Sequence, residues 1–295
     1  MHLPAPRRQL RHGHVPFRLP LTVLVLAVTA LVARTVEPVR AQVAPSLEQL
    51  RDAAGDYVRS AYPRLANLVG TEEYRQQPSA SGASRTLKSE VLLVRHPIET
   101  SNWLFFRDVL VVNGKPVPNQ QERLTNLFIS PSLANWELVR EIAHADGQYH
   151  FSGSTPSLTN PFIVVALLDR SYWPRLQFKL GKQDQDAGPA VWILELEELR
   201  SEKEEPLLAR VPSRARAWVD AATGRILKTE LRINSPSGTS SNRTTFRFDE
   251  ALRVAVTVEM KTTWSVFSPL SVNGTAKYSN YRQFGVKTEE SLKGR

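Results

Sequence analysis

The chain has 295 residues, 41% of them hydrophobic, which allows one large domain or two small ones. Its formal net charge of +9 does not indicate a nucleic-acid-binding protein. Six arginines and one acid lie in residues 1–41, which leaves +4 on residues 42–295, and no RNA- or DNA-binding motif accompanies that charge. The sequence contains no cysteine, which excludes disulfides, thiolate metal sites and a cysteine nucleophile.

Residues 1–41 have the three zones of a secretory signal peptide. The first twenty residues carry four arginines and no acid, residues 21–33 (LTVLVLAVTALVA) carry no charge, and residues 39–41 (VRA) form a small-x-small cleavage site. The apolar zone is shorter than the about 20 residues of a membrane-spanning helix. We therefore expect an exported bacterial protein, periplasmic or secreted, with no stable membrane anchor after cleavage. An uncleaved signal anchor is the alternative, and an arginine pair at residues 7 and 8 leaves the twin-arginine route open.

A long helix is expected next. Apolar residues at three- and four-residue spacing predict a helix over residues 46–73, with Ser46 as its N-cap. Pro63 interrupts this pattern, so we expect a kink or two helices in series. The segment QQPSASGAS, residues 76–84, has the composition of a loop.

Two strands and a helical insert follow. Residues 86–95 and 103–112 read as strands, and Asn113-Gly114 directly after them predicts a tight hairpin turn. A helical insert is expected at about residues 122–169, in the segments 122–128, 133–145 and 161–169. The last of these, PFIVVALLD, is almost entirely apolar and follows Asn160, a suitable N-cap, so we expect it to be buried.

Residues 175–284 alternate between apolar and polar side chains in one segment after another. This period-two pattern predicts an antiparallel sheet with one dry and one wet face. Residues 217–233 read as two strands around a turn at residues 222–224, and Leu227, Leu231 and Ile233 are predicted to share a face. Such a sheet can cover its dry face with a second sheet, by curling into a barrel or with helices, and the predicted helices favour a curved sheet around them. The predicted fold class is α+β: a strongly curved antiparallel sheet, or incomplete β-barrel, packed on the N-terminal helix and the helical insert, in a single domain over residues 42–295.

No arrangement of residues predicts catalysis, a metal site or a cofactor. His144, Asp146 and His150 lack a metal-binding spacing, and no nucleophile elbow, P-loop or dinucleotide fingerprint is present. Glu195 and Glu197 share one strand face, which favours a solvated surface over a glycosidase pair. A basic and aromatic cluster is interpreted as an amphipathic edge strand, with a lipid headgroup or partner contact as the alternative: Lys277, Tyr278, Tyr281 and Arg282.

Residues 218–233 (WVDAATGRILKTELRI) carry a Trp-x-Asp strand, a Thr-Gly turn and an alternating strand. This hairpin resembles that of the LolA/LolB-like superfamily of periplasmic lipoprotein carriers. Residues 244–260 and 274–284 resemble later strands of secreted, carrier-like bacterial proteins, and the order of elements is similar too. The resemblance implies a helix-lidded incomplete barrel with a hydrophobic cavity for an acyl chain. This chain is longer than a typical carrier, lacks the lipid-anchor cysteine of the anchored members and aligns no gating arginine, so no functional residue is transferred.

If the resemblance holds, large apolar side chains would form the cavity wall. The candidates are Trp103, Phe105, Phe162, Phe178, Trp192, Phe246, Phe248, Val258 and Met260. The same residue types build a filled core, so both interpretations stay open. The first hypothesis is a non-enzymatic carrier of a lipid or lipoprotein acyl chain. The second is an exported interaction protein with a filled core, and the third is an unrecognised hydrolase.

Overall fold

The computed structural model describes residues 44–66, 68–79, 82–95, 103–118, 141, 144, 146–151, 159–199, 207, 213–235, 238–266 and 271–283. All of these residues belong to one compact unit, residues 42–295. The predicted signal peptide lies outside the described residues. So do the predicted helix at 122–128 and, apart from residues 141 and 144, the one at 133–145.

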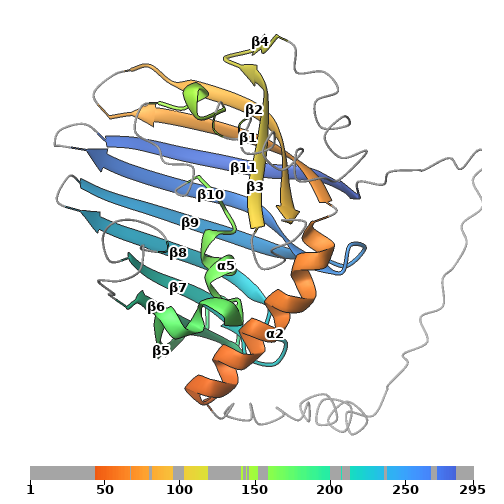
Figure 1. Cartoon of the computed structure of the whole chain (residues 1–295), viewed down its shortest axis with the longest axis vertical. Helices are drawn as coiled ribbons and strands as arrows, with labels where there is room; N and C mark the ends of the chain where they lie inside the picture. Colours follow the sequence, from red (N-terminus) through yellow and green to blue (C-terminus); the bar gives the residue numbers. More distant parts are fainter. Residues whose placement is uncertain are drawn as a thin grey trace, which may run out of the picture. The chain divides into compact units, whose positions relative to one another are not determined.

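In the described part of the chain, eleven antiparallel strands form one sheet in the order β4-β3-β2-β1-β11-β10-β9-β8-β7-β6-β5 (Figure 1). Because β1 pairs with β11, the early strands extend the later meander, and the described sheet stays open at β4 and β5. This confirms the predicted α+β class with an open antiparallel sheet. The strands are β1 (Leu68–Pro78), β2 (Arg85–Arg95), β3 (Trp103–Val112), β4 (Lys115–Pro116), β5 (Leu176–Gln183), β6 (Val191–Glu198), β7 (Ser213–Asp220), β8 (Ile226–Ser235), β9 (Gly238–Asp249), β10 (Val254–Val266) and β11 (Ser271–Gln283).

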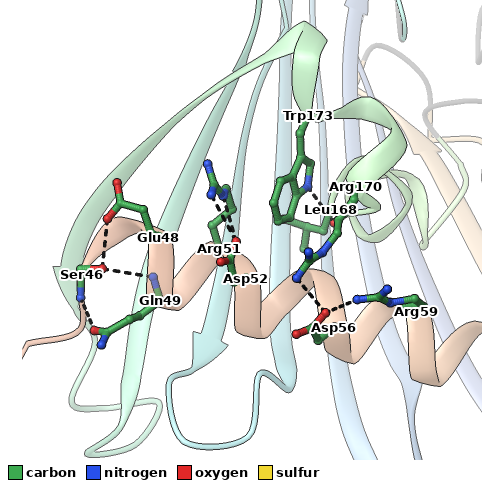
Figure 2. Close-up of polar contacts among 10 residues, drawn as sticks. All are labelled: Ser46, Glu48, Gln49, Arg51, Asp52, Asp56, Arg59, Leu168, Arg170 and Trp173. Carbon is green, nitrogen blue, oxygen red and sulfur yellow. Dashed lines mark hydrogen bonds and ion pairs between the residues drawn. The ribbon is translucent and has the colours of Figure 1, made fainter.

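The long helix α2 (Leu47–Leu65) begins with a capping box. The Ser46 hydroxyl accepts from the Gln49 amide at 3.1 Å, and the Gln49 side chain accepts from the Ser46 amide at 2.8 Å (Figure 2). Pro63 lies in the last turn, so the helix ends two residues later instead of kinking and continuing. The sequence predicts helix to residue 73, whereas β1 starts at Leu68 and alternates buried and exposed side chains.

α2, the short helix α5 (Ile163–Leu167) and two 3-10 segments, η1 (Asp146–Tyr149) and η2 (Arg170–Arg175), accompany the sheet. α2 contacts β5, β6 and β10, and α5 contacts β7 and β8. We call the face that they cover the inner face and the opposite one the outer face (Figure 1). α5 is shorter than the predicted helix 161–169, and its N-cap is Phe162, although the Asn160 side chain accepts from the Phe162 amide at 2.8 Å. No described helix is long and apolar enough to cross a membrane.

A hairpin turn and a β-bulge test two predictions made from local sequence. Asn113 and Gly114 have φ of 50° and 77°, which confirms the tight hairpin turn between β3 and β4. In β8 the register shifts beside Ile226, and Leu227 packs against Trp218 and its neighbours on the outer face. Leu231 and Ile233 point into the main core instead. The predicted shared face of Leu227 with these two residues is therefore wrong, because a β-bulge changes the alternation.

Candidate functional site

Three phenylalanines form a row across the inner face. The ring of Phe162 lies 6.2 Å from that of Phe105 on β3 and 5.9 Å from that of Phe246 on β9, and all three are buried. Phe162 belongs to residues 159–175, which contain α5 and η2 and which we call the lid segment. Beside the row is a cavity of about 20 Å³, room for a single water molecule, lined in part by Phe105, Phe162 and Tyr278. A lid side chain thus fills the apolar space between distant strands.

The other predicted wall residues are more scattered. Met260 is fully buried in the main core. Phe178 and Trp192 are half-buried and pack against that core. Phe248 is half-buried under the guanidinium of Arg225, 3.5 Å away, and Val258 is half-buried where β10 shifts register with β9. Trp103 begins β3, and its side chain lies outside the described part. The structure therefore brings Phe105, Phe162, Phe246 and Met260 into one core.

A buried ion pair lies beside the phenylalanine row. Arg107 on β3 donates from Nε and Nη2 to the two carboxylate oxygens of Glu72 on β1, at 2.5 and 2.7 Å. Tyr278 on β11 donates its hydroxyl to Glu72 Oε1 at 2.7 Å. Burial and the charge of Glu72 raise the pKa of Tyr278, so the phenol stays protonated and remains a donor. The buried carboxylate of Glu72 thus accepts hydrogen bonds from side chains of two other strands, β3 and β11, as a buried charge requires.

The same arginine holds the beginning of the lid segment. Arg107 donates from Nη1 to the Thr159 hydroxyl at 3.2 Å and from Nη2 to the Thr159 carbonyl at 3.0 Å. Its guanidinium also lies 5.1 Å from the centre of the Phe105 ring. Because Thr159 is three residues before Phe162, this contact positions the lid side chain in the row. We call it the first anchor of the lid segment.

A second anchor attaches the end of the lid segment to α2 (Figure 2). The Trp173 indole packs on Gly55, where an added Cβ would lie 2.7 Å from the ring. Trp173 donates to the Leu168 carbonyl at 3.0 Å, and the Arg51 guanidinium lies 4.5 Å from the indole centre. Arg170 adds an ion pair with Asp56 at 2.9 Å. These groups are more exposed than the first anchor, and the two anchors differ in chemistry.

His150 is a buried titratable group that lies outside the ion pair. Gln76 accepts from the Phe151 amide through Oε1 at 3.1 Å, which leaves its amide nitrogen to donate to His150 Nδ1 at 3.0 Å. Burial and then the charges of Arg107 and Arg85 lower the pKa of His150 to about 3. The imidazole is therefore neutral at physiological pH and connects the segment after η1 to β1.

We expect this histidine to make the fold less stable in acid. The unfolded chain binds a proton at His150 below about pH 6.5, whereas the folded chain does so only near pH 3. The contribution to the free energy of unfolding is thus full above pH 6.5 and falls with pH, by up to about 1.4 kcal/mol per pH unit. Urea unfolding at pH 7 and pH 5 should show a smaller difference for His150→Gln than for the wild type. An equal difference in the two proteins would contradict this assignment.

Several of these groups escape prediction from the sequence. Glu72 and Gln76 lie in segments predicted as helix and loop. Residues 71–77 (TEEYRQQ) contain a single apolar side chain, Tyr74, so no alternation of apolar and polar residues indicates the strand there. The C-terminal cluster was interpreted as an edge strand, and this is wrong, because β11 lies between β1 and β10 in the middle of the sheet. Tyr278 points inward, whereas Arg282 pairs with Glu90 at 2.5 Å.

Other candidates for chemistry do not assemble. Glu195 and Glu197 pair with Arg216 and Arg214, each at 3.3 Å. His144 is exposed. No group of three metal-ligating residues occurs among the described residues.

Comparison with known proteins gives similarities of fold. No protein-family model and no curated protein matches the sequence. A LolA superfamily protein from Nitrosomonas europaea is 14% identical, with 82% of this chain and 96% of that chain covered and a TM-score of 0.39. A DUF1329 family protein from Desulfovibrio piger is 10% identical, covering 81% and 94%, with a TM-score of 0.38. A domain from Vibrio parahaemolyticus, described as an outer membrane lipoprotein-sorting protein, is 13% identical, covering 80% and 95%, with a TM-score of 0.34. All three TM-scores are below 0.5, and these similarities assign the chain to no family.

Proposed function

We propose that the chain is an exported, non-enzymatic carrier that buries an acyl chain of a lipid or lipoprotein between the lid segment and the sheet. The observation that supports this most is the position of Phe162. Its ring fills the apolar space between β3 and β9, yet Phe162 is the N-cap of a helix of only five residues. A hydrophobic ligand can take the place of this ring if the lid segment moves.

The free energy lost by exposing Phe162 is similar to the free energy gained by burying a short acyl chain. Exposing a buried phenylalanine costs about 3 kcal/mol at most. Each buried methylene of an acyl chain contributes about 0.8 kcal/mol, so about four methylenes offset the loss of Phe162 from the row. Longer chains leave a surplus for moving the lid segment. In this mechanism Arg107 releases Thr159, while Trp173 keeps the segment attached to α2.

Lipid binding is tested on the protein as it accumulates in expressing cells. Mass spectrometry should detect acyl lipids that co-purify with the wild type. Phe162→Ala should bind a fluorescent fatty acid about tenfold more tightly than the wild type, because the truncation enlarges the apolar space. Phe248→Ala is the matched control, since Phe248 lies under the guanidinium of Arg225 and not in the row. If the protein co-purifies with no lipid, and neither the wild type nor Phe162→Ala binds the fluorescent fatty acid, the carrier proposal is wrong.

One observation favours a second function. The described cavity beside the row holds only about 20 Å³, which fits an exported interaction protein with a filled core. In that case Phe162→Ala should destabilise the fold by about 3–5 kcal/mol and gain no lipid binding. Export itself is tested by fractionating the cells and determining the N-terminal residue of the exported form, which we expect to be Gln42.

A further inference from the structure

Two rows of side chains run across the outer face, on the opposite side of the sheet from the phenylalanine row. Their members face each other strand by strand, from β5 to β1 in the first row and from β5 to β2 in the second. The first row is Gln177, Glu197, Arg214, Arg232, Ser241, Thr263, Asn273 and Gln77. The second row is Lys179, Glu195, Arg216, Glu230, Arg243, Lys261, Thr275, Arg75 and Thr86. We call these two rows the basic face.

The basic face has an excess of positive charge. It contains seven basic and three acidic side chains, a net charge of +4. Residues 42–295 also carry +4 in total, so the rest of that sequence sums to zero. These two rows therefore carry a net charge as large as that of all residues 42–295 together. A uniformly solvated surface would have no such concentration.

The basic side chains of this face are also more exposed to solvent than its acidic side chains. The side chains of Arg214, Arg232 and Lys261 are 74%, 59% and 58% exposed. Those of Glu197 and Glu230 are only 34% and 6% exposed. Because the short carboxylates lie at the base and the long basic chains extend above them, an approaching surface meets positive charge first.

Glu230 shows that the anions are held in place by their neighbours. Arg232 donates to it at 2.6 Å, and Arg243 lies 3.5 Å away. Burial acts to raise the pKa of Glu230, but the hydrogen bond from Arg232 and the charges of Arg232, Arg243 and Arg216 outweigh it and keep the pKa below its usual value. The carboxylate thus stays ionised and fixes the guanidiniums. Beside it, a groove of about 370 Å³ runs between the side chains of β5 to β8.

We infer that the basic face docks the protein on an anionic lipid bilayer, whose headgroup phosphates contact the guanidinium and ammonium groups. The eight strands, about 4.8 Å apart, spread the seven cations over about 34 Å, which is more than one small ligand can reach. The two rows contain no apolar side chain. Protein interfaces usually have an apolar, aromatic-rich centre, whereas a headgroup layer needs only charge. The surface is on the opposite side from the lid segment and does not depend on the carrier proposal.

The test is binding to vesicles of phosphatidylcholine with and without phosphatidylglycerol, measured by co-sedimentation. The protein is purified as it accumulates in expressing cells, so that wild type and variants share the same N-terminus. We compare the wild type with the triple variant Lys179→Gln, Arg214→Gln, Lys261→Gln, which leaves the ligands of Glu230 in place. Each basic residue near an anionic surface contributes about 1 kcal/mol, so the affinity should fall about 100-fold.

The matched control removes three exposed cations away from the basic face: Arg59→Gln, Lys115→Gln and Arg253→Asn. Asparagine suits position 253, where φ is 53°. The control should bind like the wild type, and added salt should weaken wild-type binding. Equal losses in both triple variants would overturn the inference, because they would reflect net charge alone. So would equal binding to vesicles without phosphatidylglycerol. Binding to soluble polyglutamate but not to vesicles would also overturn it and would favour an acidic protein partner.

Discussion

Replacing Arg107 by leucine should lower the free energy of unfolding by about 3–5 kcal/mol. The variant leaves the carboxylate of Glu72, which is fully buried, without its two hydrogen bonds from the guanidinium. Tyr278 alone cannot replace a positive charge at that position. The substitution also removes both hydrogen bonds to Thr159, so the beginning of the lid segment loses its anchor. Urea unfolding followed by circular dichroism measures the loss.

The control uses an ion pair of the same chemistry on the outer face of the sheet. Arg282 on β11 pairs with Glu90 on β2, and its side chain is 54% exposed. Arg282→Leu should therefore cost less than about 1 kcal/mol, because exposed pairs contribute little. Arg107→Lys should fall in between, since lysine keeps the charge but cannot form the paired hydrogen bonds to Glu72. Equal effects of Arg107→Leu and Arg282→Leu would contradict the role assigned to the buried pair.

Local patterns predict the strands well but not how they are assembled. Alternation along residues 176–180 and 192–197 and the Asn113-Gly114 turn depend on neighbours in sequence, and the structure has strands and a hairpin there. The pairing of β1 with β11 joins residues about 200 positions apart, and no local pattern contains it. Without that partner, residues 68–73 fit the apolar spacing of a helix, which explains the predicted helix beyond Leu65.

The site was harder to predict for the same reason. A charged residue on the dry face of a strand looks like an irregularity until its partner is known. Glu72 and Arg107 become meaningful only when β1, β2 and β3 are side by side. The phenylalanines were identified by residue type, but their row requires Phe162 to come from the lid segment. The basic face was hidden in a modest net charge, because its cations are spread over six strands.

Gly224, the single glycine of the hairpin over residues 218–233, should be highly sensitive to substitution. Its φ is 68°, in the left-handed region, and its amide donates to the Asp220 carbonyl at 2.8 Å. A Cβ at this position would lie 2.7 Å from the carbonyl carbon of Ala53 on α2, and closer still to the oxygen. The turn between β7 and β8 therefore packs directly on the helix backbone. Gly224→Ala should cost about 3 kcal/mol, the sum of a strained φ and an overlap that neither backbone can easily relieve.

Gly114 provides the matched control, because it isolates the backbone strain. Its φ is 77°, close to that of Gly224, but no atom lies within 4 Å of an added Cβ. Gly114→Ala should therefore cost only about 1–2 kcal/mol. Gly224→Asn separates the two terms further, since asparagine tolerates the left-handed region but still carries the Cβ that overlaps Ala53. Urea unfolding should rank Gly224→Ala as most destabilising, Gly224→Asn nearly as much, and Gly114→Ala least. Equal losses for the two alanine variants would mean that the turn does not rest on α2, and the covering of the inner face by this helix would have to be revised.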